Sequence, residues 1–230
     1  MDRYEFKLKP IGNAAIEAYK TLRTNLMFGS GGEKPNVITV SSSLPGEGKS
    51  STSLFLAISF AQLGQKVLLI DADMRKPGEN PANEKGLSYL LEKHLTVEDA
   101  ICSTNYENLH FLPSGLPTQN PVELFSRDRF SVMLKYLVED LHYDKVVIDT
   151  PSAGSFIDGA VIAAQTDGTL LVAKCGSTDA GSLMRSKQQL ESLSVRIIGV
   201  VLNVMKKGEY GRCSTYKRYV RYYAKQSKWL

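Results

Sequence analysis

The feature that most constrains this chain is the segment SLPGEGKS at residues 43–50. It follows a β-branched run at residues 37–40. It precedes a stretch, residues 50–63, whose apolar side chains recur at helical spacing and stop at Gly64. A strand, a glycine-rich turn and a helix in that order wrap backbone N–H groups around phosphate oxygens, and the helix N-terminus adds the positive end of its dipole. The pattern therefore predicts a phosphate-binding loop.

Two side chains of this loop suit a magnesium-bound triphosphate. Lys49 can reach the β- and γ-phosphates, and the Ser50 hydroxyl can ligate Mg²⁺. The loop departs from the usual motif at Ser43, which stands in the place of the first glycine.

Further apolar runs alternate with helical patterns along the chain. Strands are expected at residues 67–70, 109–112, 145–148, 169–173 and 197–202, helices at 14–28, 121–141, 157–165 and 180–193, and loops at 77–85 and 113–120. Strands that are apolar at every position are typical of a parallel sheet covered on both faces. The expected fold class is α/β, a P-loop NTPase with a mostly parallel sheet and helices on both faces.

Acidic residues follow two of these strands. Asp71 and Asp73 come after the strand at residues 67–70, and a spacing of two puts both side chains on one face of an extended segment. Such a pair could hold Mg²⁺ through water and accept a proton from an attacking hydroxyl, or it could be a solvated strand end whose aspartate caps the next helix. Asp149 ends another apolar strand and would order Mg²⁺ from the far side.

Composition excludes several classes of protein. Hydrophobic residues make up 43% of the 230 residues and charged residues 23%, as in ordinary globular proteins. No uncharged apolar run approaches the roughly 18–20 residues of a membrane span, and the charged N-terminus is not a secretory signal. Cys102, Cys175 and Cys213 lie far apart, so a reducing cytosol is expected.

The net charge of +4 conceals a basic C-terminal segment. Residues 205–230 carry eight bases and one acid, a net +7, which leaves −3 for the rest of the chain. Five of the eleven tyrosines lie in this segment, at Tyr210, Tyr216, Tyr219, Tyr222 and Tyr223.

Three segments together resemble the bacterial tyrosine kinases (BY-kinases), which are cytoplasmic autokinases of capsular and exopolysaccharide synthesis. They are SSSLPGEGKSS at residues 41–51, LLIDADMRKP at 68–77 and VVIDTP at 146–151. The resemblance covers nearly the whole chain and includes Glu17, Lys20 and Arg23, which are similar to the ExxRxxR oligomerisation motif with lysine at the middle basic position. Related partition and septum-site ATPases carry a signature lysine five positions before Lys49, where this chain has Leu44.

The resemblance implies a site and its roles. Lys49, Asp71 and Asp73 would be catalytic, with Asp71 as the base unless the two aspartates exchange roles. Ser50, Asp73 and Asp149 would position Mg²⁺. The implied nucleotide-binding residues are Pro45, Gly46, Glu47, Gly48, Lys49, Ser50, Ser51 and Asn203. Asn203 would contact adenine, although an asparagine in a turn explains it equally well.

The resemblance also implies an organisation and partners. Residues 1–32 would form an oligomerisation arm, 33–204 the kinase core, and 205–230 the tail whose five tyrosines are autophosphorylated in trans with ATP. The expected partners are further copies in a ring, a separate transmembrane adaptor that recruits the chain to the inner face of the plasma membrane, and a cognate tyrosine phosphatase. No nucleic acid is expected.

Other interpretations stay open from the residues alone. Basic residues among aromatics also suit single-stranded nucleic acid, a helical stripe that packs on the body, or an anionic membrane. The main alternative function is a partition- or septum-type ATPase that binds DNA or membrane through its tail. A third is an ATP-binding scaffold without turnover.

Overall fold

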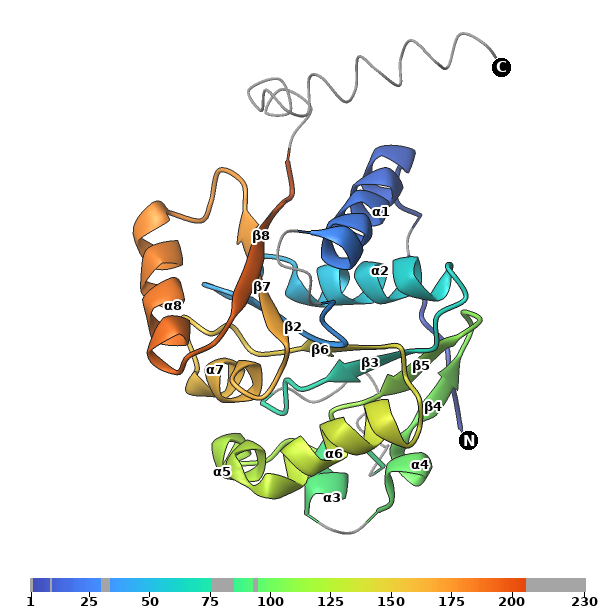
Figure 1. Ribbon diagram of the computed structural model, residues 1–230. Helices are drawn as coiled ribbons and strands as arrows, with labels where there is room; N and C mark the ends of the chain where they lie inside the picture. The colour runs from blue at the N-terminus through green and yellow to red at the C-terminus, as the bar shows by residue number, and fades with distance from the viewer. Residues whose placement is uncertain (1, 9, 30–33, 76–84, 93–94, 206–230) are drawn as a thin grey trace, which may run out of the picture.

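A computed structural model describes residues 2–8, 10–29, 34–75, 85–92 and 95–205 of the protein (Figure 1). In this part of the chain an eight-stranded sheet has the order β1-β4-β5-β3-β6-β2-β7-β8. The strands are β1 (Arg3–Tyr4), β2 (Val37–Ser42), β3 (Val67–Asp71), β4 (Cys102–Thr104), β5 (Leu109–Leu112), β6 (Lys145–Asp149), β7 (Gly168–Lys174) and β8 (Ile197–Asn203).

The sheet is parallel except where β4 runs antiparallel to β5. The carboxyl ends of β2, β3, β5, β6, β7 and β8 therefore share one edge, which is where open α/β sheets bind ligands. This arrangement confirms the expected α/β class.

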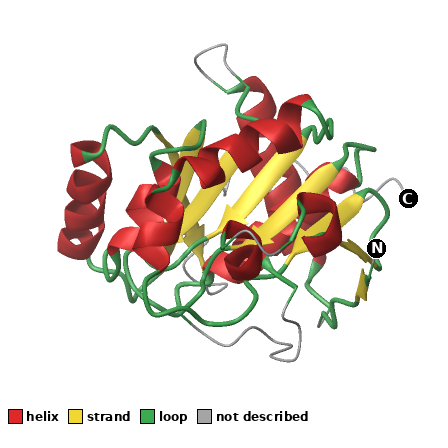
Figure 2. Cartoon of the chain, turned by 90° about the horizontal axis from the view of Figure 1, so that it is seen from below, coloured by secondary structure: helices red, strands yellow, loops and turns green. Residues whose placement is uncertain are grey.

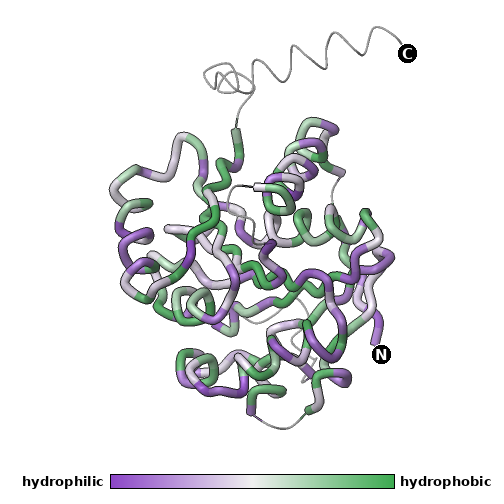
Figure 3. Tube along the Cα trace, viewed as in Figure 1, coloured by the Kyte–Doolittle hydropathy of each residue, from purple (hydrophilic) through white to green (hydrophobic). Residues whose placement is uncertain are grey.

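Helices cover both faces of the sheet (Figures 1 and 2). They are α1 (Asn13–Phe28), α2 (Lys49–Ala61), α3 (Leu87–Leu91), α4 (Val97–Ala100), α5 (Pro121–Ser126), α6 (Asp128–Glu139), α7 (Ile157–Ala163) and α8 (Ala180–Ser192). Helices α1 and α2 lie on one face, and α3 to α6 lie on the other. The central strands β2, β3 and β6 are almost wholly buried because these helices cover both of their faces, and most of their residues are apolar (Figure 3).

Two large apolar clusters form on the two faces. Phe60 of α2 is fully buried in one cluster, and Phe125 and Phe130 of α5 and α6 are fully buried in the other. Burial of one such side chain contributes about 1.5–3 kcal/mol relative to its exposure. The clusters hold α2, and therefore the loop before it, against the sheet.

The expected helix over residues 121–141 is wrong as one element. It is divided at Arg127, whose φ of −80° and ψ of 147° are extended, into α5 and α6. The Ser126 hydroxyl donates to the carbonyl oxygen of Val122, and Asp128 begins a new first turn, where a carboxylate is favourable. The remaining expected strands and helices are present, with bounds shifted by a few residues at most.

Four short elements were not expected: β1, α3, α4 and β4. Each has five residues or fewer, too few to show a periodicity. The expected loop at residues 113–120 is present, whereas most of the loop at 77–85 and nearly all of the basic tail lie outside the described residues.

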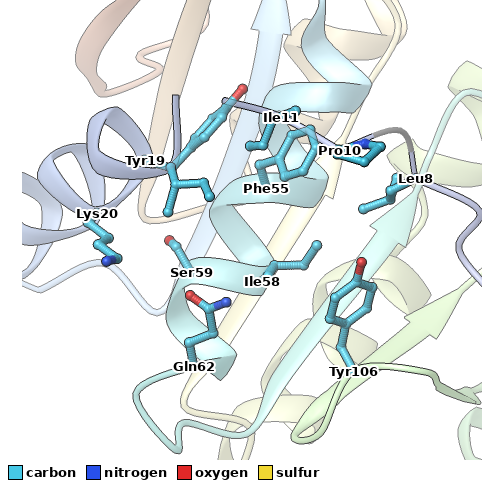
Figure 4. A pocket seen from close by; sticks show the side chains of 11 residues that line it. Leu8, Pro10, Ile11, Tyr19, Lys20, Phe55, Ile58, Ser59, Gln62 and Tyr106 are labelled. Carbon is cyan, nitrogen blue, oxygen red and sulfur yellow. The ribbon is translucent and has the colours of Figure 1, made fainter. Parts of the chain in front are cut away.

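The N-terminal arm packs on the sheet through β1 and through the rings of Tyr4 and Phe6, which contact Phe111 of β5, and the residues that follow pack on α2. Leu8, Pro10 and Ile11 lie beside α1 and α2, where a mostly apolar cavity of about 350 Å³ remains between them (Figure 4). Tyr19 of α1 stacks on Phe55 of α2 with 5.3 Å between the ring centroids, and burial raises its pKa.

Candidate functional site

Three neighbouring strands bring the predicted site together at the carboxyl edge. Strand β6 lies between β3 and β2, and Asp149 at its end is the register partner of both Asp71 and Val40. The backbone N–H of Ala72 donates to the carbonyl oxygen of Asp149 at 2.8 Å. The phosphate-binding loop follows Ser42 at the end of β2, and the Ser50 hydroxyl after it reaches Asp149. The loop and both carboxylates therefore lie at the same edge of the sheet.

The loop conformation depends on its glycines. Gly46 and Gly48 have φ angles of 78° and 93°, a region in which other residues are strained. Gly48 is the N-cap of α2, and Lys49 begins the helix with its side chain buried at 7% exposure. This strand–turn–helix geometry is the one that a phosphate-binding loop needs.

Glu47 fastens the loop to the turn after β7. Its carboxylate accepts a hydrogen bond from the backbone N–H of Leu44 at 2.9 Å and another from the Thr178 hydroxyl. The Thr178 hydroxyl also accepts from the N–H of Lys174 at 2.8 Å. Glu47 is 3% exposed, so these partners offset the cost of burying a charge. The Glu47 side chain therefore stabilises the conformation of the loop.

Asn203, expected near adenine, lies against the loop from the end of β8. Its side-chain amide donates to the carbonyl oxygen of Glu47 at 3.0 Å. A Cβ on Gly48 would come within 2.0 Å of that amide nitrogen. The backbone of Asn203 accepts from the N–H of Cys175 at 2.9 Å. The asparagine therefore ties the last strand to the turn after β7 and to the loop.

Asp149 is almost fully buried, with 8% of the residue exposed to solvent. Burial raises its pKa to about 7, and the negative charge of Asp71 adds to the rise, whereas the Ser50 hydroxyl and the Lys49 ammonium act in the opposite direction. The Ser53 hydroxyl donates to its Oδ1 at 3.3 Å. Such a group gains most from a nearby cation.

Asp71 and Asp73 are partly exposed at the end of β3. The backbone N–H of Asp73 donates to Oδ1 of Asp71 at 3.0 Å, which turns the chain and orients the Asp71 carboxylate. A partly exposed, oriented carboxylate next to a phosphate-binding loop can accept a proton from a hydroxyl.

The donors present fit a magnesium ion held jointly with phosphate. Asp149 is hydrogen-bonded to Ser50 and interacts electrostatically with Asp71 and Asp73. In the described part of the chain no group of three or more His, Cys, Asp or Glu side chains is placed to hold a metal. Mg²⁺ does not need one, because it usually keeps several waters and takes one or two carboxylates together with substrate phosphates.

The other predicted residues lie in several places. Pro45 is exposed in the loop, and Ser51 is exposed on α2. Lys20 pairs with Glu17 at 2.8 Å on α1, and Arg23 donates to the carbonyl oxygen of Ser59 at 2.5 Å, so Arg23 contacts its own α2. The tail tyrosines lie outside the described residues.

The sequence reasoning missed a linkage between the two acidic strand ends. Arg75 holds Asp158 of α7 through Nε at 2.5 Å and through a second nitrogen at 2.9 Å. The guanidinium also lies 4.5 Å from the centroid of the Phe156 ring. The only signal for Arg75 was its place in the motif at residues 68–77, and nothing pointed to Asp158 or Phe156.

Comparison with known proteins assigns the fold and suggests the chemistry. Residues 35–185 match the model of an AAA domain. Tyrosine-protein kinase YwqD of Bacillus subtilis is 36% identical over 208 residues, which cover 86% of each chain. Tyrosine-protein kinase CpsD of Streptococcus pneumoniae serotype 4 is 38% identical over 82% of this chain and 84% of its own.

A solved structure agrees with these relatives. The kinase domain of Escherichia coli tyrosine kinase ETK superposes with a TM-score of 0.76 at 34% identity, covering 84% of this chain and 76% of that one. Among the described residues no helix combines the length and the apolar character needed to cross a bilayer.

Proposed function

Because this chain belongs to the bacterial tyrosine-protein kinases, we propose that it transfers phosphate from ATP to the tyrosines of its own C-terminal segment, between copies, and thereby regulates capsular or exopolysaccharide synthesis. The acceptors are Tyr210, Tyr216, Tyr219, Tyr222 and Tyr223. The observation that carries the proposal is that Asp71, Asp149 and the phosphate-binding loop meet at one edge of the sheet, where Asp149 is the register partner of Asp71 and is hydrogen-bonded to Ser50.

The chemistry at this edge is an in-line phosphoryl transfer. The phenol oxygen attacks the γ-phosphorus, the bond from that phosphorus to the β–γ bridging oxygen breaks, and ADP leaves. The phenol proton passes to Asp71, whose carboxylate the Asp73 N–H orients. Phosphoryl transfer needs positioning and charge neutralisation, and this chain supplies both without a covalent phospho-enzyme intermediate at the site.

Each loop residue has a defined part in this reaction. Lys49 and the N–H groups of Gly46, Gly48 and Ser50 hold the phosphates. Ser50 would ligate Mg²⁺, and Asp73 and Asp149 would hold it through water. The ion, when bound, neutralises charge that develops on the phosphate oxygens. Asn203 supports the loop and borders the adenine.

Charge and topology support the tail as substrate. Strand β8 runs parallel to β7, so the chain leaves the sheet at the edge that carries Asp71 and Asp149. The residues that follow have a net charge of +7, whereas the rest of the chain sums to −3. A basic segment is attracted to an acidic site and to ATP.

The proposal includes an assembly. Glu17, Lys20 and Arg23 on α1 would meet a neighbouring copy in a ring-like homo-oligomer. A separate transmembrane adaptor would recruit the chain to the inner face of the plasma membrane and raise its activity, and a tyrosine phosphatase would reverse the modification. The isolated chain should therefore autophosphorylate weakly, and the adaptor's cytosolic segment should stimulate it.

Intact mass after incubation with Mg·ATP tests the function. The parent chain should gain phosphate increments that map to residues 205–230, more with the adaptor segment than without it, while Lys49→Met gains almost none. Release of ADP that DNA or lipid stimulates, without any change in mass, would instead indicate a nucleotide-switched positioning ATPase. Binding of ATP with neither outcome would indicate a scaffold.

A further inference from the structure

Four exposed apolar side chains stand in segments that leave the carboxyl edge of the sheet. Leu44, Leu116, Phe156 and Ile157 are each more than one third exposed. They lie in the segments that follow the carboxyl ends of β2, β5 and β6. We call these four residues the apolar rim. Exposed apolar groups that cluster beside a polar site mark a surface at which a ligand binds.

One member of the rim is held rigidly. Phe156 is 39% exposed, and its ring packs against the Arg75 guanidinium at 4.5 Å. Arg75 in turn is fixed by two hydrogen bonds to Asp158, whose side chain has no exposure to solvent. The buried Asp158 carboxylate thus fixes the Arg75 guanidinium, and the guanidinium holds the Phe156 ring in one position. Part of that ring stays exposed to solvent.

The ring is linked to the proton-accepting carboxylates by a short path. Arg75 comes two residues after Asp73 on the segment that leaves β3. The loop after β5 fastens this segment from the other side, because the N–H of Thr118 donates to the carbonyl oxygen of Met74 at 3.2 Å. These contacts therefore hold the segment of Asp71 and Asp73 and the Phe156 ring in a fixed arrangement.

We propose that Phe156, held by Arg75, binds the aromatic ring of the acceptor tyrosine and makes the enzyme select tyrosine. The occupant is a tyrosine from the basic segment at residues 205–230 of a second copy. This inference rests on the proposed function and adds the residue that determines acceptor specificity.

Physical complementarity favours that occupant. A phenol ring gains from an edge or offset contact with the exposed part of the Phe156 ring. Lysines and arginines beside the tyrosine gain from the partly exposed Asp71 and Asp73 carboxylates. Serine and threonine have no ring to contact Phe156, so they lack this gain.

Peptide binding tests the inference without depending on turnover. The probe is a fluorescent peptide with the sequence STYKRYVRYY of residues 214–223, titrated with full-length chain and Mg·ADP. Phe156→Ala should weaken its binding by roughly two- to tenfold, the value of one aromatic contact, and leave the Kd for ADP unchanged. Phe156→Trp should restore binding, and Phe156→Leu should not.

Two controls separate ring contact from charge and from folding. Val132→Ala removes an even more exposed apolar side chain, on α6 and outside the apolar rim, and should bind the peptide as the parent does. A peptide with every tyrosine changed to serine keeps its charge and should bind equally weakly to the parent and to Phe156→Ala. Melting curves of the variants should overlap with that of the parent.

The outcomes distinguish this inference from the function on which it rests. Equal affinity of the parent and Phe156→Ala for the tyrosine peptide overturns the inference, as does equal affinity of the parent for the tyrosine and serine peptides. If the ring contact is measured as expected but no phosphate reaches the peptide from Mg·ATP with the adaptor segment present, the inferred contact stands and the proposed tail phosphorylation fails.

Discussion

The side-chain amide of Asn203 donates to the carbonyl oxygen of Glu47 at 3.0 Å, which joins the end of β8 to the phosphate-binding loop across 156 residues of sequence. The same amide occupies the space that a Cβ on Gly48 would need. The last strand of the core therefore supports the phosphate-binding loop.

Asn203→Ala should weaken ATP binding by roughly three- to tenfold, because a net hydrogen bond of about 1 kcal/mol is lost from the loop. Calorimetric titration of the full chain with Mg·ATP measures the change. Asn25→Ala, on the exposed side of α1, serves as the matched control and should bind as the parent does. Unchanged ATP affinity in Asn203→Ala would show that Asn203 does not contribute to the nucleotide site.

Asp149→Asn should stabilise the protein without nucleotide at pH 8 and leave it unchanged near pH 4. Its folded-state pKa of about 7 lies above the ordinary value, so the folded state favours the neutral carboxyl. The resulting cost is absent below about pH 4, grows as the pH rises, and is complete above pH 7.

Thermal melts of this variant should show a Tm several degrees above that of the parent at pH 8. The exposed Asp140→Asn is the control and should show no difference at either pH. Mg·ADP should reduce the advantage, because a cation offsets the negative charge of the parent carboxylate. A lower Tm for Asp149→Asn than for the parent at pH 8 without nucleotide would contradict the raised pKa of Asp149.

Arg75→Ala should lower the free energy of unfolding by about 2–3 kcal/mol. It leaves the fully buried Asp158 carboxylate without its partner, and the partial exposure of Arg75 keeps the loss below that of a wholly buried pair. Urea denaturation measures it.

The double variant Arg75→Ala with Asp158→Asn tests whether this loss comes from the unpaired carboxylate. Neutralising the orphaned carboxylate should recover at least half of the lost stability. If the loss of stability in the double variant equals the sum of the losses in Arg75→Ala and in Asp158→Asn alone, the two side chains do not stabilise each other.

Tail phosphorylation should dissociate the proposed homo-oligomer. Each phosphotyrosine adds roughly −1.5 to −2 charges, so about four of them bring the tail from +7 to near zero or below and remove its attraction to a neighbour. Light scattering after incubation with Mg·ATP and the adaptor segment follows the change. A variant with phenylalanine at all five tail tyrosines should stay assembled; equal dissociation of that variant would refute the idea.

Much of the fold could be predicted from sequence because its signals are local. The runs at residues 67–70 and 146–148, which became β3 and β6, are apolar at every position, and the run at residues 37–40 of β2 departs only at Thr39. The acids Asp71 and Asp149 stand at strand ends that a parallel sheet must align. The family resemblance then added roles that no periodicity carries.

The remaining features depend on pairs that are distant in sequence. Thr178 meets Glu47 across 131 residues and Asp158 meets Arg75 across 83, and neither pair leaves a mark in the local sequence pattern. The break at Arg127 was also missed, although four consecutive polar residues, 126–129, interrupt the apolar pattern there.

A mixing experiment tests the central claim most directly. A copy with Lys49→Met, unable to use ATP but with an intact tail, is incubated with Mg·ATP, the adaptor segment and a second copy that keeps Lys49 but has phenylalanine at the five tail tyrosines. The account predicts phosphate on the tail of the Lys49→Met copy, and its loss when the second copy also carries Asp71→Asn. An unmodified tail in the first mixture, or equal modification in the second, would contradict it.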